Sequence, residues 1–186
     1  MPERPPGRAS TRTGRRAGGE PPAAATLRRI RLVILDVDGV LTDGRLWLGA
    51  DGGEWKSFHV HDGLAMARAV GRGLPVAVVS SRASGAVARR CTELGLTDVH
   101  QGVADKLGAY EALCRRHAVR DAEVAAMGDD LGDLPVLRRA GLAIAPADAV
   151  PEVRAAVDWV TRQPGGAGAV REALETILRA QRRWTG

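Results

Sequence analysis

The sequence is short of aromatic residues and cysteines, and it has no long apolar run. Its 186 residues include one Phe, one Tyr, four Trp and two Cys. The core must therefore be built from Val, Leu, Ile and Ala. Two cysteines are too few for a disulfide framework, so we expect Cys91 and Cys114 to be reduced in a cytoplasmic protein. No apolar run is long enough for a membrane span, and we expect no membrane association.

Lysine is also rare. Of the 27 Lys and Arg residues, only Lys56 and Lys106 are lysines. Lysine carries a compact point charge, whereas the guanidinium of arginine is a planar fork. We therefore expect each lysine to mark a position that needs a point charge.

The N-terminal segment, residues 1–27, carries much of the net charge of +5, because it holds five Arg against two Glu. It is rich in Pro, Gly and Arg and has no periodicity, which predicts a disordered tail before a single domain at 28–186. A basic tail can bind the phosphates of nucleic acid. This one has no aromatics for base stacking and no binding motif, which favours an unselected extension over a nucleic-acid partner.

Short runs rich in β-branched residues alternate with helical patterns along the rest of the chain. The runs predict strands at 30–37, 75–81, 98–102, 123–130, 141–146 and 158–161. The patterns between and after them predict helices at about 62–72, 83–94, 104–118, 131–139, 150–156 and 167–182. Such alternation is typical of βαβ units, so we predict a parallel sheet in an α/β fold.

One segment, residues 43–60, interrupts this alternation. Strand-like pieces near 45–49 and 54–60 flank the Gly-rich sequence GADGG, which predicts a projecting β-hairpin. His59 and His61 would alternate along its second strand and share a face. Two histidines could begin a metal site, but without a third ligand nearby a surface role or a substrate contact is favoured.

Polar side chains follow several predicted strands at the point where each strand ends. Ligands of open parallel sheets bind beyond these carboxyl ends. An isolated Asp-x-Asp would indicate only a turn, but four segments place acids, hydroxyls and a lysine at one edge, which indicates a catalytic site. These residues are Asp36, Asp38, Ser80, Ser81, Lys106, Asp129, Asp130 and Asp133.

At these residues the sequence resembles the haloacid dehalogenase superfamily of phosphotransferases. The stretch DVDGV at 36–40 matches the first motif of the superfamily, Ser80 the second, Lys106 the third and GDDLGD at 128–133 the acidic fourth. The resemblance extends from about residue 30 to 180. The stretches DVDGVLTDG, GEWKSF and GGAGAVRE are similar to phosphatases of this superfamily that act on sugar acids. The resemblance implies a three-layer, Rossmann-like parallel sheet.

The chain leaves no room for a cap domain. The predicted hairpin, helices and short strand fill the segments between Asp36 and Ser80 and between Ser80 and Lys106, so the site is open unless another chain covers it. The hairpin concentrates large apolar side chains, and such a patch marks an interface. The resembling phosphatases pack these hairpins together, which implies a homotetramer. The apolar residues are Leu46, Trp47, Leu48, Trp55 and Phe58.

The resemblance also implies the roles of the motif residues. Asp36 is the expected nucleophile, which forms an aspartyl-phosphate. Asp38 is the expected general acid, which then activates water. Ser80 would donate a hydrogen bond to a phosphoryl oxygen, and Lys106 would neutralise negative charge.

Clustered carboxylates at this edge favour a hard divalent cation. We expect Mg²⁺, which prefers oxygen ligands. Its predicted ligands are Asp36, the backbone carbonyl of Asp38, and Asp129. Asp130 and Asp133 are either direct ligands, groups that support the ligands from behind, or caps of the following helix, and the sequence leaves these alternatives open.

A further group of residues is implied to contact the substrate. The chain departs from the family pattern here, because Ser80-Ser81-Arg82 stands where Thr-Gly-Arg is usual and His61 stands where arginine is frequent. These departures leave the exact sugar open. The implied residues are Lys56, His61, Asp62, Gly63, Ser81 and Arg82.

The resemblance as a whole implies an Mg²⁺-dependent phosphoric monoester hydrolase. The leading substrate is the small sugar-acid phosphate octulosonate 8-phosphate, and a nonulosonate 9-phosphate of a sialic or deaminated sialic acid is the alternative. Another alternative is a non-catalytic assembly module, like similar domains fused to sialate cytidylyltransferases. The intact set of Asp36, Asp38, Lys106 and Asp129 argues against it, because assembly does not need them.

Overall fold

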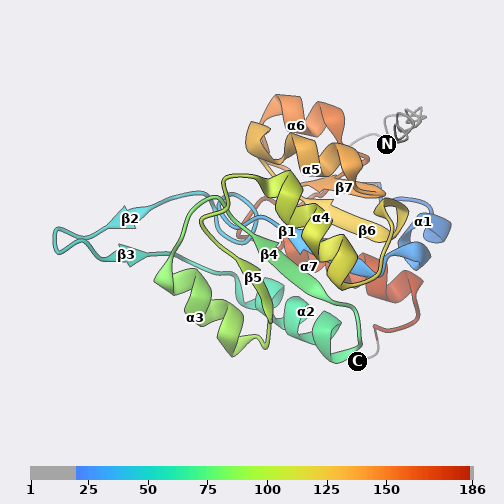
Figure 1. Cartoon of the computed structure of the whole chain (residues 1–186), viewed down its shortest axis with the longest axis horizontal. Coiled ribbons are helices and arrows are strands. Elements are labelled where there is room, and N and C mark those ends of the chain that lie inside the picture. Colours follow the sequence, from blue (N-terminus) through green and yellow to red (C-terminus); the bar gives the residue numbers. More distant parts are fainter. Residues whose placement is uncertain (1–19, 185–186) are drawn as a thin grey trace, which may run out of the picture.

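Six parallel strands form the centre of the protein. The computed structural model describes residues 20–184, and Figure 1 shows the sheet between two layers of helices. The strands lie in the order β5-β4-β1-β6-β7-β8. This arrangement confirms the predicted α/β fold, with each strand shorter than expected. The strands are β1 Leu32–Leu35, β4 Val76–Val79, β5 Asp98–His100, β6 Val124–Met127, β7 Leu142–Ala145 and β8 Trp159–Val160.

Helices cover both faces of the sheet and explain its apolar strands. Val33 and Leu35 of β1 pack in one core, while Leu32 and Ile34 pack in the other. Because both faces are covered, β1, β4, β6 and β7 are buried along their whole length. The helices on the first face are α1 Ala24–Arg29, α2 Val60–Gly71, α3 Gly85–Glu93 and α7 Ala169–Ala180, and those on the second are α4 Lys106–Arg116, α5 Leu134–Arg139 and α6 Pro151–Ala156.

The N-terminal boundary of the domain differs from the prediction. Residues 24–27 belong to α1, and Leu27 is only 4% exposed in the core. The Gln181 side-chain amide donates hydrogen bonds to the carbonyls of Leu27 and Ile30, which fastens α1 to the end of α7. The expectation of disorder up to residue 27 is therefore wrong for this helix. Residues 1–19 of the predicted tail lie outside the described residues.

The predicted hairpin projects from the body of the molecule (Figure 1). Its strands, β2 Trp47–Leu48 and β3 Glu54–Trp55, pair antiparallel with Trp47 opposite Trp55. The expected second strand was too long, because α2 begins at Val60 and His59 is its N-cap residue. Apolar side chains at helical spacing, Ala65, Met66 and Ala69, bury this helix in the core.

The helical start of this segment changes the interpretation of the two histidines. The rings of His59 and His61 lie edge to face with centroids 5.1 Å apart, at the first turn of a helix and not on a strand. The prediction that they share a strand face is wrong. Within residues 20–184, no helix is long and apolar enough to cross a membrane.

Candidate active site

The loop after β1 turns sharply beneath its two aspartates. The carbonyl of Val37 accepts hydrogen bonds from the backbone amides of Val40, Leu41 and Thr42. Gly39 has a φ of 83°, and a Cβ at this position would lie 2.0 Å from Oδ2 of Asp129. Only glycine fits this turn. The turn therefore brings the Asp36 loop against the loop after β6.

Lys106 connects the two acidic loops. Its Nζ lies 2.8 Å from Oδ1 of Asp36 and 2.7 Å from Oδ1 of Asp133. Burial disfavours the charged ammonium, but the two carboxylates outweigh it and raise the pKa of Lys106. Lys106 is the first residue of α4, so the crossover after β5 delivers a permanent positive charge to the carboxyl edge of β1 and β6.

Three carboxylates gather at this edge of the sheet. Asp36, Asp129 and Asp133 each place an oxygen within 4.8 Å of the others. Burial raises the pKa of Asp129 to about 7, and the neighbouring carboxylates of Asp36, Asp133 and Asp130 act in the same direction. Burial and the charge of Asp133 raise the pKa of Asp36 to about 6, against the opposing effect of Lys106. The cluster therefore has an excess of negative charge that a cation would balance.

Asp129 is the carboxylate best placed to hold such a cation. Its Oδ1 is buried without a hydrogen-bond partner among the described residues. A buried and unpaired carboxylate oxygen is costly unless something binds it. Together with the raised pKa values, this oxygen makes the donor set fit an oxygen-coordinated divalent metal such as Mg²⁺.

Asp133 and Asp130 are occupied by the protein itself. Oδ2 of Asp133 accepts hydrogen bonds from the amides of Asp129 and Asp130, at 3.0 and 3.3 Å. Asp130 is exposed, and its Oδ1 accepts a hydrogen bond from the amide of Leu131 at the start of η2, Leu131–Asp133. These contacts favour a role in shaping the loop over direct metal ligation.

The loop after β4 adds hydroxyls and an arginine. Ser80 is buried at the end of β4, and its Oγ accepts a hydrogen bond from the amide of Arg82 at 3.2 Å. Its hydroxyl hydrogen is thereby left to donate elsewhere. Ser81 is exposed. The Arg82 guanidinium lies 2.8 Å from Glu54 and 3.7 Å from Oδ2 of Asp38.

Lys56 makes its contacts inside the chain, and the predicted substrate contact stays a prediction. Its side chain is 0% exposed, and its Nζ forms a close ion pair with Oδ1 of Asp38. Glu54, which the sequence analysis did not single out, lies 3.8 Å from the same ammonium. The spacing Glu-x-Lys in GEWKSF was the available signal, because side chains two residues apart on a strand point to the same side. The fold therefore uses Lys56 within the chain.

Asp62 and Gly63 also have internal roles. Asp62 is 1% exposed, and its carboxylate accepts hydrogen bonds from the amides of Gly168 and Arg171 at 3.1 and 2.6 Å. It thereby satisfies the N-terminus of α7 from α2. A Cβ on Gly63 would lie 2.1 Å from the Arg90 guanidinium, so this glycine permits close packing. A substrate contact of either residue stays a prediction.

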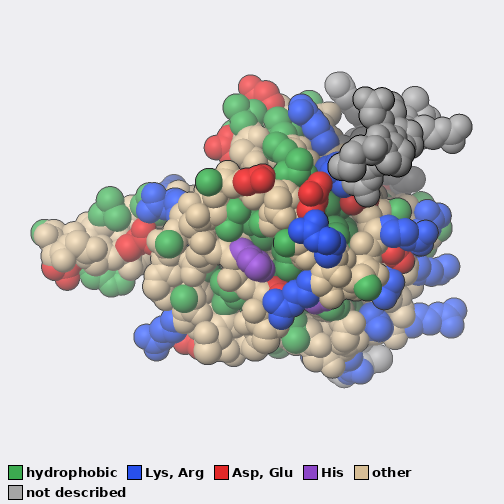
Figure 2. Space-filling model, viewed as in Figure 1, with side chains coloured by type: hydrophobic (Ala, Val, Ile, Leu, Met, Phe, Trp, Pro, Cys, Tyr) green, Lys and Arg blue, Asp and Glu red, His purple; other side chains and the backbone are tan. Residues whose placement is uncertain are grey.

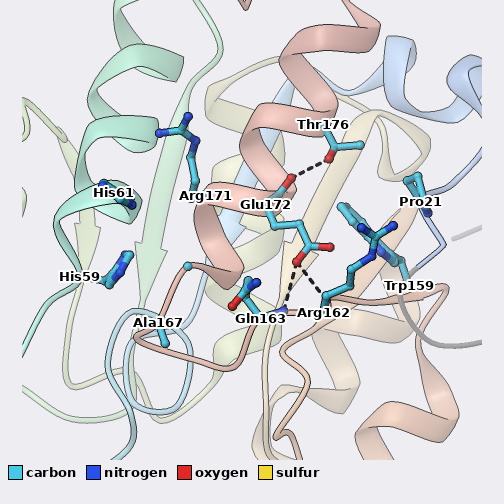
Figure 3. A pocket seen from close by; sticks show the side chains of 11 residues that line it. Pro21, His59, His61, Trp159, Arg162, Gln163, Ala167, Arg171, Glu172 and Thr176 are labelled. Carbon is cyan, nitrogen blue, oxygen red and sulfur yellow. Dashed lines mark hydrogen bonds between the residues drawn. The ribbon is translucent and has the colours of Figure 1, made fainter.

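His61 is exposed but faces a different part of the surface. His59 and His61 line an open hollow of about 540 Å³. Figure 3 shows them across from residues of α7 and the loop after β8. The Glu172 carboxylate in this hollow accepts the amides of Arg162 and Gln163. The described contacts of the chain do not connect His61 to the Asp36 cluster. A contact between His61 and the substrate stays a prediction.

These features define a class of enzyme. The site lies at the carboxyl edge of a parallel sheet and combines Asp-x-Asp after β1, a lysine at the start of α4 and an acidic loop after β6. This combination is typical of phosphotransferases of the haloacid dehalogenase type. Residues 90–174 match the family described as haloacid dehalogenase-like hydrolase. The 3-deoxy-D-manno-octulosonate 8-phosphate phosphatase KdsC of Escherichia coli K12 is 44% identical over 157 residues, which cover 84% of each chain.

Solved structures agree with the sequence comparison. The phosphatase of the same name from Yersinia pestis has a TM-score of 0.85 at 40% identity and covers 86% of both chains. That from Moraxella catarrhalis, in complex with a magnesium ion, a phosphate ion and a KDO molecule, has a TM-score of 0.83 at 38% identity, over 86% of this chain and 91% of that one. The chain belongs to the KdsC family of haloacid dehalogenase-like phosphatases and is a phosphoric monoester hydrolase.

Proposed function

We propose that the chain hydrolyses 3-deoxy-D-manno-octulosonate 8-phosphate to the free sugar acid and phosphate. The single observation that carries the proposal is the Asp36–Lys106 pair beside the unpartnered oxygen of Asp129. The relatives of that name support the substrate, as does the neighbour that holds KDO and phosphate. The free and buried cysteines Cys91 and Cys114 support the cytoplasm as its location.

Mg²⁺ is the proposed cofactor. Asp36, Asp129 and the backbone carbonyl of Asp38 would hold it, and the neighbours that carry magnesium or cobalt support this choice. When bound, it supplies positive charge that stabilises the transferring phosphoryl group. Asp133 would act behind these ligands, since its own oxygens already accept hydrogen bonds from Lys106 and two backbone amides.

Asp36 and Asp38 divide the chemistry in this proposal. An oxygen of Asp36 attacks phosphorus, the bond from phosphorus to the sugar oxygen breaks, and an aspartyl-phosphate forms. The protonated Asp38 gives its proton to the departing sugar oxygen. Asp38 then takes a proton from water, which attacks phosphorus, releases phosphate and restores Asp36. Lys106 and the free hydroxyl hydrogen of Ser80 stabilise the negative phosphoryl oxygens.

A phosphate-release screen over sugar phosphates tests this function. The panel contains octulosonate 8-phosphate, two nonulosonate 9-phosphates and unrelated hexose phosphates, each with Mg²⁺ and with chelator. We expect the highest kcat/KM for the octulosonate in the presence of Mg²⁺ only. A clear preference for a nonulosonate would replace the substrate. No release from any compound would favour a non-catalytic module and overturn the proposal.

We further propose that the chain works as a homotetramer joined through its hairpins. Trp47, Leu48 and Trp55 are 61%, 71% and 59% exposed, and Figure 2 shows hydrophobic side chains along the projecting hairpin. A two-stranded ribbon is marginally stable in water by itself. Phe58 differs from the expectation, because it is partly buried and packs against the core of its own chain. The remaining apolar face still fits contact with another copy.

Trp47→Glu should break this assembly. The substitution places a charge in the proposed interface, where burial without a partner is costly. Light scattering should give the mass of a tetramer for the wild type and a smaller mass for Trp47→Glu, and we expect KM to rise by about tenfold. Trp47→Phe is the matched control and should keep the wild-type mass. A monomeric and fully active wild type would contradict the assembly.

A further inference from the structure

Each of the two lysines of this chain is paired with one of the two aspartates that follow β1. Lys106 lies 2.8 Å from Asp36, and Lys56 forms the close pair with Asp38. The lysines come from different elements, since Lys56 follows β3 of the hairpin and Lys106 begins α4. An otherwise arginine-rich chain thus places its two lysines where a compact ammonium contacts an aspartate of the site.

The burial of Lys56 ties it firmly to Asp38. Its side chain has no exposure, and a buried ammonium is costly unless carboxylates pair with it. Asp38 is the nearer partner, and Glu54 lies 3.8 Å away. Arg82 in turn pairs with Glu54 at 2.8 Å. Two cations and two anions therefore form a balanced network at the base of the hairpin, and Lys56 is its innermost member.

The two carboxylate oxygens of Asp38 have different partners in this network. Lys56 holds Oδ1, whereas Oδ2 has the Arg82 Nε at 3.7 Å and accepts no hydrogen bond from the described part of the chain. Oδ2 is thus the oxygen left to carry a proton. A carboxylate held at one oxygen keeps a single orientation, and proton transfer depends strongly on such orientation.

We infer that Lys56 is a positioning residue, which orients the Asp38 carboxyl so that Oδ2 exchanges protons during catalysis, and that it does not bind substrate. The inference rests on the proposed function, in which Asp38 is the general acid. It also assigns the hairpin a role inside its own subunit, because Lys56 directly follows Trp55 of the exposed apolar face. Holding that face in place would hold Lys56 on Asp38.

The leaving group of the substrate separates this role from the alternatives. A sugar oxygen leaves phosphorus as a poor, alkoxide-like group and needs the proton of Asp38. The p-nitrophenolate of p-nitrophenyl phosphate leaves without a proton. Both substrates need Asp38 afterwards, when water attacks the aspartyl-phosphate. A defect in Asp38 therefore slows both steps with the sugar phosphate but only the second step with the aryl phosphate.

Lys56→Met is the test variant, since it keeps most of the length of the side chain and removes its charge. With the sugar phosphate, we expect kcat to fall by about ten- to a hundredfold with little change in KM. With p-nitrophenyl phosphate, rapid mixing should show a burst of about one p-nitrophenolate per active site, followed by slow turnover. Asp38→Asn should show the same burst, and the double variant with Lys56→Met should turn over no more slowly than Asp38→Asn alone.

Several outcomes would overturn the inference alone while the wild type remains active. One is a rise of KM at unchanged kcat, as expected for a substrate contact. A second is a loss of kcat in Lys56→Met that adds fully to the loss in Asp38→Asn. A third is an equal loss of kcat for both substrates without a burst. If Lys56→Met does not fold, Lys56→Arg, which keeps the charge, is measured in the same way. It should show a smaller loss of kcat and a less pronounced burst. A wild type without any phosphatase activity would overturn the proposed function and this inference with it.

Discussion

Asp36→Asn should lower turnover by at least about a thousandfold without harming the fold. An amide nitrogen or oxygen does not replace the carboxylate as a nucleophile toward phosphorus. The shape of the side chain is kept, and Lys106 still has Asp133 at 2.7 Å. Because the fold raises the pKa of Asp36 to about 6, the ionised carboxylate lowers the stability of the folded state at pH 8, where it is ionised in both the folded and the unfolded chain. Removing this charge at pH 8 should therefore leave Tm unchanged or raise it.

Phosphate release and a thermal melt measure the two parts of this expectation. Asp105→Asn is the matched control, because Asp105 is the exposed N-cap residue of α4 directly before Lys106. Asparagine caps a helix about as well as aspartate, so the control should keep activity within about twofold. A near-normal rate in Asp36→Asn would remove Asp36 from the role of nucleophile. A collapsed melt would show that the residue supports the fold instead.

The position of the acidic cluster could be predicted because the local signals agree. A short apolar run with β-branched residues, such as 32–35, favours a buried strand, and Asp36 and Asp38 follow it directly. Parallel pairing then brings the ends of β1, β4 and β6 to one edge whatever the loops do. Lys106 needed only one further element, the helix after β5. These residues depend only on parallel pairing, which the alternation of strands and helices along the chain indicates well.

The roles of Lys56 and Asp62 could not be predicted in the same way. Both depend on contacts between elements whose relative placement no local pattern gives. Asp62 binds the N-terminus of α7, which begins more than a hundred residues later at Ala169. Lys56 depends on where the hairpin leaves the body of the protein. A motif can mark such residues as important without telling whether they face the substrate or the protein.

Asp129→Ala should remove the response to Mg²⁺ and lower the rate by about a hundredfold or more. Asp129 supplies the one buried carboxylate oxygen of the cluster that lacks a partner in the described chain. Its pKa of about 7 means that the metal-free fold loses stability as the pH rises from about 4 to 7, because the folded state holds the proton more tightly than the unfolded state. At pH 8 the metal-free variant should therefore melt no lower than the wild type.

The melt with and without Mg²⁺ gives a readout that does not need activity. Mg²⁺ should raise the Tm of the wild type by mass action and should leave that of Asp129→Ala nearly unchanged. Asp130→Ala is the neighbouring control, and it should keep the Mg²⁺ response because Asp130 is exposed and its Oδ1 is used by the amide of Leu131. Protons compete with the metal for Asp36 and Asp129, so the response of the wild type should shrink as the pH falls toward 6. An equal Mg²⁺ response in Asp129→Ala, or full activity in excess chelator, would place the metal elsewhere or remove it from the reaction.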